Sequence, residues 1–425
     1  MAFAGIFVSE AARLGLPVPA LEMGMEDVKS AYPRTPVRTT RFNIIAMMGE
    51  SGEEVVFRES FGLSLGNRSS VPVYTRRAAL LNEAARFFLA VPSHPYVDDY
   101  PVIDLALSCG SAQWALSKVF SEVLGAMPFS SDKSVSPAAV CVALGVGYDF
   151  SDTHRSLAQA DLFPVHAKLE DNLSTLRYAK LTNVFHPGLA SKVLGQLSQL
   201  STVLFGRVGF SALRPLRTHN SDTWNDDLSS MLDLLEAIFA AAVLSRCTFR
   251  LGVELIDRVV IYSDAQNTPP GLGFVFSDRH VKLYGSRPPP KGYLQSLGCN
   301  PREINCLELV AAVALLFSLP SHLIRNRRII FCVDNSATLA ALVTGSSSLP
   351  HMALLARAFQ IKMAMLRLSC WFEVVSSECN LADLPSRSGG YCAALEVEGD
   401  RMIDLRVPPL DLLDHPDSIV REALC

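Results

Sequence analysis

The second half of the sequence alternates short strand-like runs with a long helical pattern, and this alternation restricts the chain to an α/β fold. Residues 257–265 (DRVVIYSDA) and 327–334 (RRIIFCVD) are rich in β-branched residues, and each strand is expected to end at an aspartate. The run 271–276 (GLGFVF) predicts a returning strand. Residues 302–319 (REINCLELVAAVALLFSL) have the length and apolar spacing of a buried helix. The sequence therefore predicts a sheet with carboxylates at the ends of its strands.

Composition indicates a globular protein of two or three domains. The chain has 425 residues, of which 49% are hydrophobic and only 19% are charged. No apolar run reaches membrane-spanning length, because 237–244 is bounded by Glu236 and Arg246, and 309–320 ends at a proline. The ten cysteines form no C-x-x-C pair, which disfavours a zinc site. We expect an intracellular protein, in the cytoplasm or the nucleus, with reduced thiols and no membrane partner.

The charge of the chain gives only a weak indication of whether it binds nucleic acid. The net charge of −4 argues mildly against a protein that coats nucleic acid, since phosphate binding usually leaves a basic surface. Arginines do cluster locally at 76–77, 207–217 and 325–328. Each cluster is compatible with a contact to a phosphate backbone or with an ordinary solvated face.

Two adjacent aspartates stand out near the first quarter of the chain. In 93–104 (SHPYVDDYPVID) they are flanked by tyrosines and β-formers, which predicts a hairpin that presents Asp98 and Asp99 at its turn. Asp27, in 24–32 (GMEDVKSAY), supplies a third carboxylate. Three carboxylates on a rigid sheet suit a pair of divalent cations. The alternatives are a polar turn without chemistry and, for Asp27, a helix N-cap.

The remaining stretches of the chain predict helices, one further strand and a tail. Residues 111–125 have an amphipathic pattern that we expect to end at Gly125, and 139–150 (AVCVALGVGYDF) is expected to be a buried strand that ends in glycines. The region 151–250 is predominantly helical in pattern, most clearly at 225–246. Residues 396–425 contain three prolines and are expected to be peripheral.

The N-terminal motifs resemble those of reverse transcriptases. The YVDD sequence resembles their Tyr-x-Asp-Asp motif, and 27–32 (DVKSAY) looks like their first palm motif. The resemblance implies that Tyr32 is the steric gate against a ribose 2′-hydroxyl, that Phe61 and Gly62 cradle template and nucleotide, and that Lys133 is the later-motif lysine. It also implies an RNA template, a DNA primer and dNTPs as partners. From the residues alone, Tyr32 and Phe61 are equally compatible with core aromatics, and Lys133 with a surface lysine.

The C-terminal motifs resemble the ribonuclease H module that follows many reverse transcriptases. Asp264, Glu308, Asp334 and Asp383 occur in the order Asp, Glu, Asp, Asp of that module. The stretch 380–387 (NLADLPSR) is similar to long-terminal-repeat and DIRS-type retroelements. The resemblance implies that these four residues are catalytic and bind Mg²⁺ or Mn²⁺, as do Asp27, Asp98 and Asp99 in the palm. The implied substrate of the module is an RNA–DNA hybrid.

The resemblance covers roughly residues 20–390 and divides the chain into four parts. We expect a truncated palm with a mostly antiparallel sheet at 1–150, a helical thumb or connection at 151–250, a mixed-sheet ribonuclease H-like domain at 251–395, and a tail at 396–425. No oligomeric state or protein partner can be predicted.

The sequence also departs from the reverse transcriptase pattern. Only 26 residues precede Asp27, so either the fingers subdomain is missing or the sequence begins inside a longer protein, and Pro33 stands where the family usually has a basic residue. Primer extension is therefore expected to be feeble or absent, because the basic clamp for the triphosphate is lacking. The module 251–395 is expected to cut hybrids without the N-terminal region. The alternative is a decayed or exapted protein that binds nucleic acid or a protein partner without catalysis.

Overall fold

The chain folds into two compact units, and each is of mixed α/β type, as the sequence predicts. The computed structural model describes residues 2–48, 54–64, 68–123, 129–152, 159–204, 207–241, 246–251, 259–300, 303–388, 392–397, 399–414 and 420. The first unit comprises Met1–Asp161 and Thr248–Val253, and the second comprises Leu162–Cys247 and Glu254–Cys425.

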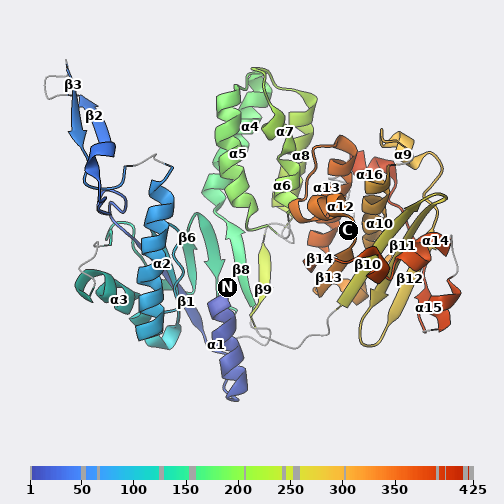
Figure 1. The fold of residues 1–425 in the computed structure, drawn as a ribbon, viewed down its shortest axis with the longest axis horizontal. Helices are drawn as coiled ribbons and strands as arrows, with labels where there is room; N and C mark the ends of the chain where they lie inside the picture. Colours follow the sequence, from blue (N-terminus) through green and yellow to red (C-terminus); the bar gives the residue numbers. More distant parts are fainter. Residues whose placement is uncertain are drawn as a thin grey trace. The chain divides into compact units, whose positions relative to one another are not determined.

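The first unit is built from short sheets flanked by helices (Figure 1). Strand β1 lies between β4 and β5 and pairs with both in antiparallel fashion, and β2 and β3 form a separate exposed hairpin. The strands β6, β7, β8 and β9 form another sheet in that order. The elements are α1 (Ala2–Arg13), β1 (Leu21–Asp27), β2 (Ile44–Met48), β3 (Val55–Glu59), α2 (Ser70–Leu89), β4 (Asp99–Leu105), α3 (Ser111–Lys118), β5 (Val135–Ala138), β6 (Val140–Ala143), β7 (Val146–Asp149), β8 (Gln159–Pro164) and β9 (Cys247–Arg250).

Two local features of this unit bear on the sequence predictions. The stretch expected to be one buried strand is a hairpin, β6–β7, because Leu144 and Gly145 both take positive φ angles, 55° and 73°, which is the backbone of a tight two-residue turn. The predicted helix at 111 is confirmed as α3, which continues into a π-helical turn at Val119–Val123. Its expected cap, Gly125, lies outside the described residues.

The second unit begins with the helical region that the sequence predicts. Its helices are α4 (His166–Thr182), α5 (Pro187–Ser201), α6 (Val208–Ala212), α7 (Arg214–Thr218) and α8 (Asp226–Ala240). Helix α8 begins where the side chain of Asn225 accepts a hydrogen bond from the backbone N–H of Leu228. The backbone N–H of Arg207 donates to the buried side chain of Gln360, 2.8 Å away, so this region packs against the remainder of the unit.

The rest of the second unit is a mixed sheet between two helical layers. Its strands follow the order β14-β13-β10-β11-β12-β15, with β10 antiparallel to β11 and parallel to β13. The elements are β10 (Val259–Asn267), β11 (Pro270–Ser277), β12 (Lys282–Arg287), α9 (Tyr293–Ser296), α10 (Ile304–Ser318), α11 (Ser321–Ile324), β13 (Arg328–Val333), α12 (Ser336–Thr344), α13 (Pro350–Met365), β14 (Ser369–Val374), α14 (Asp383–Ser388), α15 (Ala393–Val397), β15 (Arg401–Met402) and α16 (Leu410–Asp414).

The two faces of this sheet are covered by different helices. Phe274 and Phe276 of β11 belong to the large core that includes α10 and α13, whereas Val275 packs with Cys392 and Leu395 in a smaller cluster. This alternation is what a strand buried on both faces requires. Figure 1 shows α10 and α13 on one side of the strands and α14 and α15 on the other.

Two expectations about this unit are wrong. Strand β10 does not end at Asp264 but runs on to Asn267, because it stays paired with β11 as far as the turn, with Asn267 opposite Pro270. The residues after 396 are not peripheral: β15 pairs with β12, and Leu405 and Leu413 are buried in the main core. Apolar burial thus overrides the proline content of this segment. Within the described part of the chain, no helix combines the length and apolarity needed to cross a membrane.

Candidate functional site

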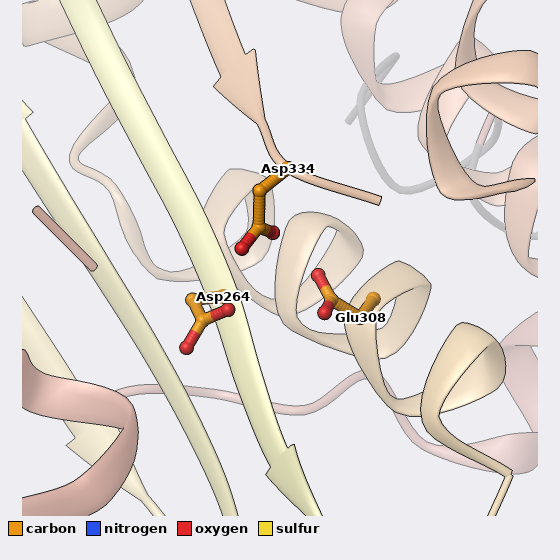
Figure 2. Close-up of side chains that lie close together, drawn as sticks. All are labelled: Asp264, Glu308 and Asp334. Atoms are coloured by element: carbon orange, nitrogen blue, oxygen red, sulfur yellow. The ribbon is translucent and has the colours of Figure 1, made fainter. Parts of the chain in front are cut away.

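Three carboxylates of the second unit converge at one point of the sheet (Figure 2). Asp264 lies within β10, Asp334 directly follows β13, and Glu308 is in the first half of α10. One ligand oxygen from each lies within 4.8 Å of the others. They meet because β10 and β13 are parallel neighbours and α10 packs against β10. We call these three residues the nuclease cluster.

Two carboxylates of the nuclease cluster are buried and Asp334 is half-buried, and no described cation compensates their charge. Asp264 and Glu308 are each 5% exposed. Among the described residues, no lysine, arginine or histidine forms an ion pair with any of the three carboxylates. Burial raises the pKa of Glu308 to about 9, and the charges of Asp264 and Asp334 add to this effect. Burial, and then Asp334 and Asp383, raise the pKa of Asp264 to about 6, although a hydrogen bond from Ser386 opposes the increase.

The donor atoms fit a hard divalent cation. Glu308 Oε2 and Asp334 Oδ1 are buried, and neither has a hydrogen-bond partner among the described residues. Buried carboxylate oxygens without partners are costly unless a cation or a proton satisfies them. Oxygen ligands at this spacing are those that Mg²⁺ and Mn²⁺ prefer. The nuclease cluster can therefore hold such an ion.

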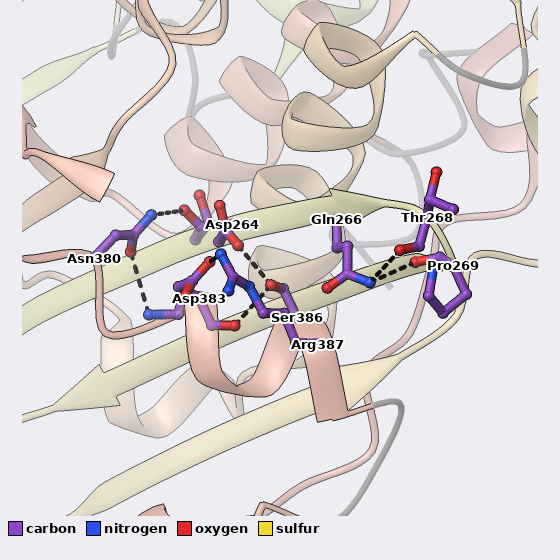
Figure 3. A network of polar contacts seen from close by, with 10 residues as sticks. Asp264, Gln266, Thr268, Pro269, Asn380, Asp383, Ser386 and Arg387 are labelled. Carbon is purple, nitrogen blue, oxygen red and sulfur yellow. Dashed lines mark hydrogen bonds and ion pairs between the residues drawn. The ribbon is translucent and has the colours of Figure 1, made fainter. Parts of the chain in front are cut away.

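The fourth predicted carboxylate, Asp383, lies at the start of α14, beside the cluster but outside the three-residue group. Its Oδ1 is 2.6 Å from Arg387 Nη2, and its charge still contributes to the raised pKa of Asp264. Figure 3 shows α14 lying along β10, with Ser386 and Asp383 turned toward Asp264. The structure thus brings all four predicted residues into one region, with Asp383 paired to an arginine.

Close backbone approach allows α14 to lie there. A Cβ on Gly273 would lie 2.3 Å from Ser386 N, and one on Gly271 would lie 2.0 Å from Ser386 O, so neither position tolerates a side chain without movement of α14. Sequence reasoning missed the role of these glycines and of Ser386. The available signal was the alternation of glycines in 271–276, on the strand that returns beside Asp264.

The N-terminal carboxylates also meet. Asp27 ends β1 directly opposite Asp99, the first residue of β4, and Asp98 precedes it in a tight turn. The turn is closed by hydrogen bonds between Tyr96 and Asp99, with Val97 at a φ of 57°. The predicted hairpin is therefore confirmed. We call Asp27, Asp98 and Asp99 the palm cluster.

Unlike the nuclease cluster, the palm cluster has a basic neighbour. Lys133 Nζ lies 3.2 Å from Asp27 Oδ2, and the lysine side chain is 61% exposed while that of Asp27 is 9% exposed. Burial, and then the charges of Asp98 and Asp27, raise the pKa of Asp99 to about 6, and Lys133 acts in the opposite direction. Lys133 is thus placed at the predicted site rather than on an unrelated surface.

The other residues predicted for the palm lie in one loop region. Tyr32 packs against Tyr74 with ring centroids 5.3 Å apart, and it lies close enough to Asp98 for that charge to raise its pKa, after the larger effect of burial. Gly62 is buried, and a Cβ there would lie only 1.8 Å from Pro33 O. Phe61 is 75% exposed. Gly62 therefore permits close packing of its segment beside Tyr32.

Comparisons with solved structures identify distant likenesses to this chain. No protein-family profile matches the chain, and no curated protein matches it. A structure of the foamy viral protease-reverse transcriptase dRH in complex with double-stranded DNA is 13% identical, with a TM-score of 0.43, and the match covers 87% of this chain and 58% of that one.

Two further structures of the foamy viral protease-reverse transcriptase are similar at the same level. The complex with an RNA/DNA hybrid is 13% identical, with a TM-score of 0.41 and coverage of 87% of this chain and 45% of that one. The complex with double-stranded DNA is 16% identical, with a TM-score of 0.40 and coverage of 83% and 67%. The chain thus spans about half the length of the first two. These likenesses are too distant to assign the chain a family or an activity.

Proposed function

We propose that the second unit is a metal-dependent nuclease that cleaves the RNA strand of RNA–DNA hybrids, as the motif resemblance implies. The observation that carries this proposal is the nuclease cluster itself, in which three carboxylates from separate elements lie together, two of them buried and one half-buried, without a neighbouring cation among the described residues. Such an arrangement is unfavourable for a protein that does not bind a cation, because the charges repel one another and are poorly solvated.

Each carboxylate has a distinct part in this proposal. Asp264 and Asp334 would hold Mg²⁺ or Mn²⁺ from the sheet, Glu308 would hold it from α10, and Asp383 would contribute to a second ion from α14. A bound pair of such ions supplies an activated water and stabilises the leaving oxygen. The chain's own contribution is to fix the carboxylates on rigid elements and to keep Asp264 and Glu308 away from bulk solvent.

The test is a hybrid-cleavage assay on the full chain with Mg²⁺ or Mn²⁺. Asp334→Asn keeps the side-chain volume and removes the charge, so we expect the folded variant to lose cleavage by at least about a hundredfold. Asp404→Asn is the matched control, because its side chain is 71% exposed and lies outside the cluster; it should cut like the wild type. A folded wild-type chain that is inert with both metals would refute the nuclease and favour a non-catalytic binding protein.

We further propose templated DNA synthesis at the palm cluster, with an RNA template, a DNA primer, dNTPs and Mg²⁺ or Mn²⁺. The pairing of Asp27 with Asp99 and the position of Tyr32 near Asp98 support it. Extension is expected to be feeble at most; where it is detected it should depend on Asp99, and Tyr32→Ala should relax discrimination against ribonucleotides, because a smaller side chain admits the 2′-hydroxyl. Extension that survives Asp99→Asn unchanged would exclude this site.

A further inference from the structure

One buried hydroxyl contacts the nuclease cluster directly. Ser386, in α14, is 2% exposed, and its Oγ donates a hydrogen bond to Asp264 Oδ2 at 2.5 Å. The backbone oxygen of Asp383 lies 3.0 Å from the same Oγ. A serine hydroxyl carries a single proton, and the ionised carboxylate at the shorter distance is the stronger acceptor. Asp264 Oδ2 therefore accepts the hydrogen bond of this hydroxyl, and the bond restricts the rotation of the Asp264 carboxylate.

The position of Ser386 is itself fixed from several directions. The backbone of Ser386 lies against Gly271 and Gly273, where no Cβ intervenes. Ser286 Oγ donates to the carbonyl of Pro385, and Asn380 Nδ2 donates to Ser263 O at 3.1 Å. Both of these bonds end on backbone carbonyls, whereas the Ser386 bond ends on a carboxylate of the cluster. Figure 3 shows the bond from Ser386 to Asp264.

We propose that Ser386 is a positioning residue, which holds the carboxylate of Asp264 in the orientation that a divalent cation requires. The inference rests on the proposed nuclease function. It also links the two parts of the site, since the helix that presents Asp383 is the helix that orients Asp264. Removal of the hydroxyl would leave Asp264 able to rotate in a buried space, so metal affinity would fall although all four carboxylates remain.

The experiment compares Ser386→Ala with Ser286→Ala in the full chain. Both substitutions remove one buried hydroxyl that anchors α14, but only Ser386 contacts the cluster. Binding of Mn²⁺ is measured first without nucleic acid, by electron paramagnetic resonance, and hybrid cleavage is then measured over a range of Mn²⁺ concentrations. Loss of an orienting partner of a metal ligand typically lowers metal affinity about 10- to 100-fold.

We expect Ser386→Ala to weaken Mn²⁺ binding by about tenfold and to recover part of its cleavage at high Mn²⁺, while Ser286→Ala binds Mn²⁺ within about twofold of the wild type. Melting curves in EDTA identify any variant that fails to fold. If both variants bind Mn²⁺ equally well, or if both weaken it equally through loss of packing, the positioning role is refuted. If the folded wild-type chain neither binds Mn²⁺ nor cuts, the nuclease proposal itself fails.

Discussion

The two acidic clusters each bring three carboxylates together but differ in how their charge is compensated. In the palm cluster, Lys133 lies 3.2 Å from Asp27 and opposes the rise in the pKa of Asp99. In the nuclease cluster, no described cation pairs with Asp264, Glu308 or Asp334. The palm cluster is thus partly compensated by the protein itself, whereas the nuclease cluster depends on a bound cation or on protons for its compensation.

This difference has an energetic counterpart. Without a metal, the nuclease cluster can lower its repulsion only by binding protons, and the pKa of Glu308 is accordingly raised to about 9. In the palm cluster the exposed Lys133 partly offsets the repulsion between the carboxylates, and the pKa of Asp99 is raised only to about 6. The nuclease cluster should therefore be the more sensitive of the two to protons and to divalent ions.

A pair of glycine substitutions should break the two sites separately. Gly273→Ala places a methyl group 2.3 Å from Ser386 N, so α14 must move and carry Asp383 and Ser386 away from Asp264. We expect hybrid cleavage to fall by at least about tenfold, because orienting contacts to a metal ligand are lost. Rates are measured on the full chain with Mn²⁺, after circular dichroism has shown that the variant is folded.

The matched substitution in the first unit is Gly62→Ala, where the new methyl group would meet Pro33 O beside Tyr32. It should leave hybrid cleavage unchanged and alter primer extension or nucleotide selection, if these activities are detected. Equal loss of cleavage in both variants would show that the two sites are not independent.

A truncation should sharpen the comparison by isolating the nuclease cluster. The compact unit includes the helical region before β9 as well as the sheet, and Gln360 accepts its hydrogen bond from Arg207 in that region. We expect a fragment of residues 251–425 to melt about 10 °C below one of residues 162–425, because the face that packs against these helices loses its cover. Thermal denaturation followed by circular dichroism checks this, and equal melting temperatures would show that the helices add nothing to stability.

The pH dependence of stability should separate the clusters further. An unfolded glutamate has a pKa near 4.3, whereas Glu308 in the folded protein has a pKa of about 9. Between these two pH values the folded state binds more protons than the unfolded state. The free energy of unfolding therefore falls as the pH rises through this range toward 9. Glu308→Gln should raise the melting temperature at pH 8 in EDTA by roughly 5 °C and flatten its decline with pH. A wild-type melting temperature that stays constant from pH 5 to 9 in EDTA would contradict this.

The smallest expected effect concerns Lys133. Because this lysine opposes the raised pKa of Asp99, Lys133→Gln should raise that pKa further, with little change in global stability since the side chain is mostly exposed. Carboxyl carbon chemical shifts measured during a pH titration report the change. A lower pKa for Asp99 in the variant would mean that Lys133 does not compensate the palm cluster.

Much of the fold follows from local patterns in the sequence. The runs rich in β-branched residues in the second half identify the strands, and the aspartate pair with its aromatic flanks identifies the hairpin at Asp98 and Asp99. The continuation of β10 past Asp264 could not be predicted, because it depends on pairing with a strand that turns back only after Asn267. Likewise, the burial of Leu405 and Leu413 depends on distant partners rather than on their own neighbours in the chain.

The candidate sites likewise have features that the sequence predicts and features that only the tertiary structure shows. Carboxylates in a motif order can be found from the sequence, but the partners that set their protonation and orientation are distant in the sequence. Lys133 is 106 positions from Asp27, and Ser386 is 122 positions from Asp264. The motif resemblance already implies Lys133 at the palm site, whereas only the tertiary structure shows that a hydroxyl contacts the nuclease cluster.

The separation of the nuclease carboxylates along the chain has a consequence for biosynthesis. Asp264 and Asp383 are brought together only when β10, β13 and α14 have all docked, and such non-local contacts form late in folding because loop closure must precede them. A nascent chain that has exposed β10 and α10 but not yet α14 therefore lacks a complete site. On the proposed function, nucleolytic activity appears only after translation has passed residue 388, so that incomplete products do not attack hybrids in the cell.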